Sequence, residues 1–250
     1  NNMQEDNKIA YKKTIKWLYN EKRAEGGQNK YMKLISLFIT VLIILLTTSG
    51  CISEREEPET YDNETENLSY EGKSLTPIAQ QRNNAIKGTQ YIDRESYRLQ
   101  VNGLVEKPLN LTYEEITAMP QVSKVVELNC VEGWSFTAKW TGVRIADLFE
   151  EAGAMENATT AIFYCADGYS TSLDRDYLLE NDIILAYRLN DVTLPPDRGF
   201  PLQLVAEDKY GYKWAKWIIR IELSDSPYRG YWEERGYNNT ADVGGPELER

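Results

Sequence analysis

The stretch Glu127–Gly142 reads ELNCVEGWSFTAKWTG, and it places one of the three cysteines of the chain in a polar loop. The residues before it, 122–128, are rich in β-branched side chains and predict a strand that ends close to Cys130. A structural cysteine usually lies among aliphatic residues, whereas this one is followed closely by a glutamate and a glycine. The thiol is therefore a functional candidate, with two structural alternatives: a half-buried free thiol or a disulfide with Cys165.

The amino-acid composition restricts the chemistry that the chain can perform. The 250 residues are 42% hydrophobic and 11% aromatic, which is enough for a sizeable core, and they include no histidine. The lack of histidine excludes Ser-His-Asp and Cys-His nucleophilic catalysis, histidine-ligated zinc and histidine-ligated haem. The sequence also contains no C-x-x-C pair, G-x-G-x-x-G loop or Walker loop. Cys130 is therefore the most interesting catalytic candidate.

Charge is spread unevenly along the chain, which carries a net charge of -11. Asp and Glu dominate residues 52–75, where few aliphatic side chains are present. Such a segment cannot bury enough apolar surface to fold, so we expect an acidic disordered tether there. No face rich in Lys and Arg stands out, so nucleic acid is not an expected partner.

The segment Met32–Cys51 predicts export and attachment to a membrane. A short basic start precedes a mostly apolar run at 34–46, which suits a signal peptide better than a span of the bilayer. The small residues before Cys51 resemble a lipoprotein signal, in which the cysteine is lipidated. We therefore expect an upstream extension at 1–31, a signal peptide at 32–51, and a protein held by lipid on Cys51 at the outer face of the cytoplasmic membrane. The alternative is a plain anchor helix, which leaves the protein on the same side.

Short strands and short helices alternate in the expected folded domain, 76–237, which we expect to be followed by a flexible tail at 238–250. Thr112 and Glu115 have the spacing of a capping box, and Gly153 is placed to end a helix. We expect helices at 111–120, 144–152 and 174–180, and strands at 97–102, 122–128, 161–164, 183–189, 202–205 and 214–223. This pattern predicts an α+β fold with a mixed, sheet-rich core.

Several ordered motifs give the chain a family resemblance. They include the run Cys130–Ser135 (CVEGWS), Phe163–Tyr169 (FYCADGY), Leu185–Asn190 (LAYRLN), Gly199–Leu202 (GFPL) and Lys209–Trp214 (KYGYKW). Together they resemble the sulfite oxidase-like molybdopterin oxidoreductases over roughly residues 80–237. The resemblance implies a sulfite oxidase-type molybdopterin-binding fold and a molybdenum-molybdopterin cofactor.

The resemblance also implies roles for individual residues. The thiolate of Cys130 is expected to be the protein ligand of molybdenum and the catalytic residue, which agrees with the affinity of soft thiolates for redox-active metals. The positions expected to bind the cofactor are Asn83, Asn84, Cys165, Arg198, Gly211, Tyr212 and Lys213, with the last three near its phosphate. Gln203 is a departure, because relatives usually have an arginine at this position.

The same resemblance suggests a reaction. The CVEGWS run and the short domain look closest to the exported methionine sulfoxide reductase branch, so we expect two-electron reduction of a small-molecule or protein-bound S-oxide. Electrons would come from a separate membrane or cytochrome-type redox partner. One alternative is a sulfite dehydrogenase. Another, of a different class, is a metal-free surface binding lipoprotein with the same fold, which the Gln203 departure would favour.

Overall fold

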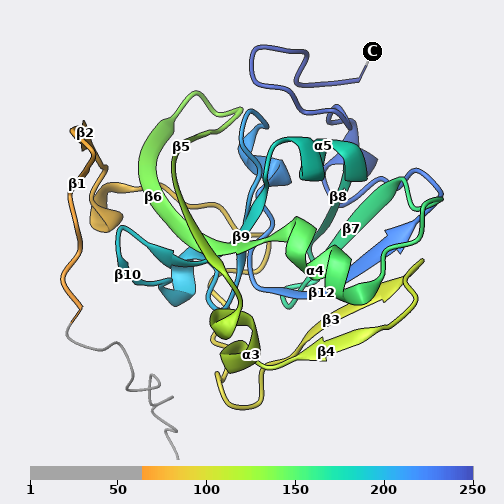
Figure 1. The fold of residues 1–250 in the computed structure, drawn as a ribbon. Helices are drawn as coiled ribbons and strands as arrows, with labels where there is room; N and C mark the ends of the chain where they lie inside the picture. The colour runs from red at the N-terminus through yellow and green to blue at the C-terminus, as the bar shows by residue number, and fades with distance from the viewer. Residues whose placement is uncertain (1–63, 250) are drawn as a thin grey trace, which may run out of the picture. The chain divides into compact units, whose positions relative to one another are not determined.

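The computed structural model describes residues 64–249, which fold around two five-stranded sheets (Figure 1). The upstream extension, the signal peptide with Cys51, and residues 52–63 of the expected tether lie outside the described residues. The first sheet has the strand order β10-β9-β6-β5, with β11 paired to β9, and the second has the order β4-β3-β12-β7-β8. In the second sheet, β12 runs parallel to β3 and antiparallel to β7. The expected α+β fold with a mixed, sheet-rich core is therefore confirmed.

The elements are short, as expected. The strands of the first sheet are β5 (Gln121–Asn129), β6 (Ser135–Arg144), β9 (Ile184–Leu189), β10 (Val192–Thr193) and β11 (Gln203–Val205). Those of the second sheet are β3 (Leu99–Gly103), β4 (Leu109–Leu111), β7 (Thr160–Cys165), β8 (Ser170–Asp174) and β12 (Ile218–Ser224). The helices are α3 (Tyr113–Ala118), α4 (Ile145–Ala152) and α5 (Arg175–Glu180), with 3-10 turns η1 (Ile78–Gln80), η2 (Pro196–Arg198), η3 (Gly211–Lys213) and η4 (Glu233–Arg235).

The helix ends follow from local sequence signals. Glu115 N donates to the Thr112 hydroxyl at 3.1 Å, and Thr112 N donates to the Glu115 carboxylate at 2.7 Å, which is the predicted capping box. Gly153 ends α4 in the left-handed conformation with a φ of 63°, which a residue with a Cβ adopts only at a cost. Both caps are confirmed. The last strand is shorter than expected, because Trp217 has a φ of 55° and β12 begins only at Ile218.

One hydrophobic core joins the two sheets and their helices. Trp140 in β6, Leu148 in α4, Phe163 in β7 and Leu185 in β9 are all fully buried in it. Figure 1 shows α4 lying between the strands of the two sheets. The core fixes the ends of β5, β7 and β11, from which the functional loops project.

The expected tether boundary at residue 75 is wrong. Residues within 64–75 form a hairpin of β1 (Ser69–Tyr70) and β2 (Lys73–Ser74). The carboxylate of Glu64 lies 2.9 Å from the guanidinium of Arg188, and Asn67 N donates to Asn190 O at 2.9 Å. Glu64, one of the acidic side chains that suggested a solvated segment, is thus a partner of the folded domain.

The expected flexible tail is also wrong for the described residues 238–249. Asn238 N donates to Glu247 O at 2.9 Å, and the Tyr212 hydroxyl donates to Asn238 O at 2.8 Å. Ala241 is fully buried. The segment has little apolar periodicity, so its order depends on hydrogen bonds to distant residues and not on a pattern that can be recognised in sequence.

Replacing Gly142 with alanine is expected to destabilise the domain. This glycine lies at a register shift between β6 and β9, and a Cβ built on it would stand 1.9 Å from Leu185 O, which belongs to fixed backbone. We expect Gly142→Ala to lower the free energy of unfolding by about 3 kcal/mol, the upper range for overpacking. Gly133→Ala is the control variant. The φ of 80° at Gly133 also disfavours a side chain, but no heavy atom lies within 4 Å of a Cβ built there, so this variant has the backbone strain without the clash. Equal losses for the two variants in urea titrations would contradict this account.

Candidate active site

Cys130 lies in the tight turn that joins β5 to β6. Its backbone N donates to Trp134 O at 2.9 Å, and Gly133 N donates back to Cys130 O at 3.0 Å. Gly133 has a φ of 80°, a conformation that favours glycine and allows the chain to reverse there. The thiol is half-buried, and this burial raises its pKa. The turn therefore fixes the sulfur at the end of a rigid strand.

A second turn of the same design follows β7. Cys165 N donates to Tyr169 O at 2.9 Å, and Gly168 N donates to Cys165 O at 3.0 Å. Both turns have the sequence pattern Cys-x-acidic-Gly-aromatic, although the pattern is short enough to pass unnoticed in the sequence. In each turn the acidic and aromatic residues, Glu132 with Trp134 and Asp167 with Tyr169, line the same cavity. Two strand ends thus present matching side chains to one site.

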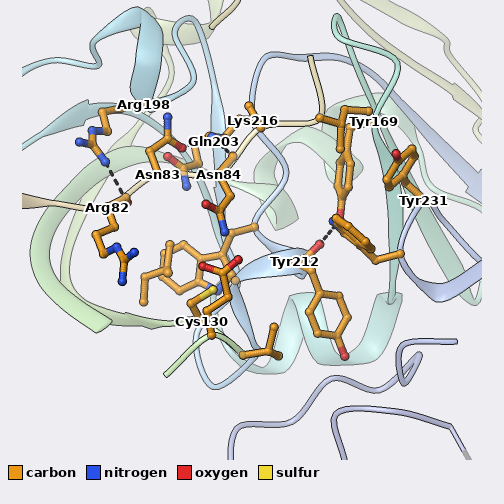
Figure 2. Close-up of a pocket in the computed structure, with 18 of the residues that line it drawn as sticks. Arg82, Asn83, Asn84, Cys130, Tyr169, Arg198, Gln203, Tyr212, Lys216 and Tyr231 are labelled. Carbon is orange, nitrogen blue, oxygen red and sulfur yellow. Dashed lines mark hydrogen bonds between the residues drawn. The ribbon is translucent and has the colours of Figure 1, made fainter. Parts of the chain in front are cut away.

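The cavity has a volume of about 610 Å³, a size typical of ligand sites. Six residues expected from the sequence line it, and Figure 2 labels most of them: Asn83, Asn84, Cys130, Arg198, Gly211 and Tyr212. Gln203, the departure from the family pattern, lines it as well. The structure therefore brings together residues that are more than a hundred positions apart in the sequence.

Arg198 holds the segment that carries the two asparagines. Its guanidinium donates to three backbone carbonyls, those of Arg82 at 3.0 Å, Ile78 at 3.1 Å and Gln81 at 2.5 Å. Arg198 is buried, and desolvation lowers its pKa. Most of its hydrogen-bonding capacity is used in positioning the neighbouring chain, so its contribution to ligand binding is chiefly indirect.

Lys216 is a cation of the site that was not among the expected site residues. Its ammonium donates to Asn84 O at 2.6 Å and to the side chain of Asn83. Desolvation, together with the positive charge of Arg198, lowers the pKa of Lys216 to about 8. The lysine lies two positions after the Lys209–Trp214 motif, and this proximity is a sequence signal that could have identified it.

Lys213, which the sequence predicted to lie near the cofactor phosphate, does not line the cavity. Its side chain is fully buried, and its ammonium lies 2.5 Å from the carboxylate of Glu233 and 2.9 Å from Ser172 O. Desolvation lowers the pKa of Lys213, and the charge of Glu233 opposes that shift. The ammonium is engaged by a partner twenty positions away in the sequence, so it is directed into the protein.

Cys165 also lies outside the cavity lining. The side chain is 4% exposed, and burial raises its pKa well above the ordinary value. Cys130 and Cys165 are both free thiols, so the disulfide considered from the sequence is not present. The expected contact of Cys165 with the cofactor stays a prediction, whereas the turn that it begins contributes Asp167 and Tyr169 to the site.

The donor set fits an anionic molybdenum cofactor with sulfur ligands. Cys130 offers a soft donor, Asn83 and Asn84 offer amides, and Arg82 and Lys216 provide positive charge at the same cavity. Residues 64–249 contain no cluster of three or more His, Cys, Asp or Glu side chains that could hold a metal ion. The thiol must lose its proton when a metal binds, because the thiolate is the ligand. When bound, such a cofactor supplies two-electron oxygen-atom transfer, while the protein binds and orients it.

The fold and the site define a molybdopterin-dependent oxidoreductase. The family model described as "oxidoreductase molybdopterin binding domain" matches residues 86–232, and the chain belongs to this family. The protein is therefore a molybdenum-dependent enzyme with a molybdopterin cofactor. Within the described residues, no helix is both long and apolar enough to cross a membrane.

Individual relatives agree with this assignment. The chain is 37% identical to the uncharacterized oxidoreductase YuiH of Bacillus subtilis, with 61% of the chain and 77% of the relative covered. It is 40% identical to the putative protein-methionine-sulfoxide reductase subunit YedZ1 of Azospira oryzae, with 59% and 56% covered. The sulfane dehydrogenase SoxCD of Paracoccus pantotrophus is a structural neighbour with a TM-score of 0.54 and 25% identity, over 56% of this chain and 41% of that one.

Proposed function

We propose that the protein reduces S-oxides, methionine sulfoxide among them, and that Gln203 is the observation that favours this direction over sulfite oxidation. The side chain of Gln203 is 4% exposed and lines the cavity that contains Cys130. An amide can donate a hydrogen bond to the oxygen of a neutral sulfoxide. Sulfite and sulfate are anions, and their binding depends on cations such as the arginine that relatives usually have here. The printed name of YedZ1 agrees with sulfoxide reduction.

Arg198 does not replace the missing arginine in this proposal. Its guanidinium is occupied by the carbonyls of residues 78, 81 and 82, as described above. Gln203 pairs with Lys216 through an isolated β-bridge, but the ammonium of Lys216 is bonded to Asn83 and Asn84. Gln203 itself thus offers a neutral amide, and the two nearby cations hold neighbouring chain segments.

The proposed reaction takes a sulfoxide, two electrons and two protons and gives a thioether and water. The sulfur–oxygen bond breaks, the sulfur is reduced, and the oxygen leaves as water. The sequence contains no histidine-ligated haem and no dithiol, so the electrons are proposed to come from a separate membrane or cytochrome-type protein. The substrate is a free or protein-bound S-oxide.

The location proposed for this reaction is the outer face of the cytoplasmic membrane, with lipid on Cys51 as the anchor. The support is the basic start, the apolar run and the small residues in Met32–Cys51. One acyl chain binds a membrane only marginally, so a second chain or the redox partner would strengthen the attachment. Mass spectrometry of the protein from native membranes tests this, and an unmodified Cys51 would exclude the lipid anchor.

Replacing Gln203 with arginine is expected to shift specificity from sulfoxides toward sulfur oxyanions. The purified holoenzyme is assayed in both directions, with methionine sulfoxide plus reduced dye and with sulfite plus oxidised dye. We expect the wild type to favour the sulfoxide. The ratio of sulfite to sulfoxide kcat/KM should rise about tenfold in Gln203→Arg, and the Kd for sulfate should fall about tenfold, equivalent to about 1.4 kcal/mol.

Gln203→Leu is the matched control, because it removes the amide without adding charge. Gln203→Leu should lower kcat/KM for the sulfoxide by about tenfold, which is the expected effect of losing one buried hydrogen bond. The Kd for sulfate should not fall in this variant. A wild-type enzyme that oxidises sulfite faster than it reduces any sulfoxide would support the sulfite dehydrogenase alternative and overturn the proposal.

A further inference from the structure

Aromatic side chains cover one side of the cavity. Tyr169, Tyr212, Tyr231, Trp232 and Tyr237 all line it, and we refer to them as the aromatic wall. Each ring contacts the next, so that the five form a row in space. The ring centroids are 5.9 Å apart for Tyr169 and Tyr231, 5.2 Å for Tyr231 and Trp232, 5.3 Å for Trp232 and Tyr237, and 5.1 Å for Tyr237 and Tyr212. These spacings are within the range of favourable aromatic contacts, so the wall is continuous.

The wall and the polar residues of the site occupy different sides of the cavity. In Figure 2, Arg198, Gln203, Asn83 and Asn84 lie together on one side, with Cys130 below the asparagines, whereas Tyr169, Tyr212 and Tyr231 lie on the other side. The polar side has the amides and cations that fit an anionic cofactor. The aromatic side is suited to the part of a ligand that is apolar and uncharged.

The C-terminal segment supplies much of this wall, and a buried ion pair holds the segment in place. Glu233 follows Trp232 directly and is fully buried, with its carboxylate bonded to the ammonium of Lys213 and to the Thr171 hydroxyl at 2.5 Å. Lys213 belongs to η3, whose other residues face the cavity. The ion pair thus links the loop beside Cys130 to the segment that bears the wall.

The wall also extends beyond the part of the chain that the family model matches. That match ends at residue 232, whereas Tyr237 lies after it. The hydroxyl of Tyr212 donates to Asn238 O at 2.8 Å, which fixes the position of the segment next to Tyr237. Tyr237 therefore lies outside the part of the chain that defines the family match, and it is a natural place for substrate preference to be set.

We propose that the aromatic wall binds the apolar substituents next to the sulfur of the substrate, and that it makes methionine sulfoxide with apolar neighbours in a peptide a better substrate than dimethyl sulfoxide. This inference rests on the proposed sulfoxide reduction. Aromatic rings gain stability from contact with apolar and aromatic groups, whereas dimethyl sulfoxide offers only two methyl groups for such contact. The wall is a specificity element, and the chemistry remains with the cofactor that Cys130 is proposed to ligate.

The test compares two substrates of the holoenzyme, a tripeptide Phe-Met(O)-Phe with blocked ends and dimethyl sulfoxide. Tyr237→Ala is expected to lower the ratio of peptide to dimethyl sulfoxide kcat/KM about tenfold, mainly through a higher KM for the peptide. Tyr237→Phe keeps the ring and should stay within twofold of the wild type. Tyr91→Ala is the control variant, because Tyr91 is 46% exposed and does not line the cavity, and it should leave the substrate ratio unchanged.

A binding measurement separates recognition from turnover. In the absence of an electron donor the oxidised enzyme cannot reduce the peptide, so its Kd can be measured by tryptophan fluorescence, and we expect it to rise about tenfold in Tyr237→Ala. An unchanged Kd and an unchanged substrate ratio would overturn the inference. A loss of molybdenum from Tyr237→Ala would also overturn it and assign the wall to the cofactor. If the wild type reduces neither substrate, the proposed function fails, which is distinct from failure of the wall.

Discussion

Replacing Cys130 with serine is expected to abolish activity and to release most of the molybdenum. The hydroxyl is a harder and far less acidic donor than the thiol, so it is a poor replacement for a thiolate on a soft metal. Changes to residues that merely support a metal ligand cost 10- to 100-fold, so loss of the ligand itself should lower kcat by at least about 100-fold. Metal analysis of purified protein and a steady-state assay with methionine sulfoxide measure both effects.

Cys165→Ser is the matched control for this variant. Cys165 begins a turn with the same hydrogen bonds as that of Cys130, but its sulfur is buried outside the cavity lining. We expect Cys165→Ser to retain its molybdenum. Equal loss of metal from the two variants would mean that the cysteines act through stability and not through ligation, and would contradict the role of Cys130.

Lys213→Met is expected to produce the largest loss of stability among the substitutions considered. It would leave the carboxylate of Glu233 fully buried without its ammonium partner. Removing one member of a buried ion pair costs about 3–5 kcal/mol, because the remaining charge is neither solvated nor compensated. For a domain of this size the melting temperature should fall by roughly 10 °C or more. Thermal unfolding followed by circular dichroism measures the change.

The double variant Lys213→Met with Glu233→Leu distinguishes a structural role from cofactor binding. Replacing both charges with apolar side chains of similar volume is often nearly neutral for stability, so the double variant should recover most of the loss. If Lys213 held the cofactor phosphate instead, the single variant would lose molybdenum with little change in melting temperature. The double variant would then not recover the metal.

Local signals predicted the elements of the fold better than their arrangement. The capping box at Thr112 and the terminating glycine at Gly153 depend on residues a few positions apart, and both agree with the structure. The parallel pairing of β12 with β3 joins segments about 120 positions apart, and no local pattern encodes it. The same limit applies to residues 238–249, whose order depends on partners such as Tyr212.

The same distinction between local sequence signals and long-range contacts applies to the site residues. Family motifs predicted Cys130 and the two asparagines, and all three line the cavity. The same motifs predicted Lys213, which does not line it, since the direction of its side chain depends on Glu233 in a segment outside the motifs. They also gave no indication of the aromatic wall, because Tyr231, Trp232 and Tyr237 belong to a polar stretch without periodicity. Side-chain direction and long-range contacts are the information that only the structure provides.

X-ray absorption at the molybdenum edge tests the central claim, that the sulfur of Cys130 ligates the metal, most directly. The measurement compares the wild-type holoenzyme with Cys130→Ser that retains residual metal. We expect the wild-type spectrum to require one more sulfur at bonding distance than the spectrum of the variant. An identical sulfur count in the two proteins would contradict the assignment of Cys130 as the molybdenum ligand.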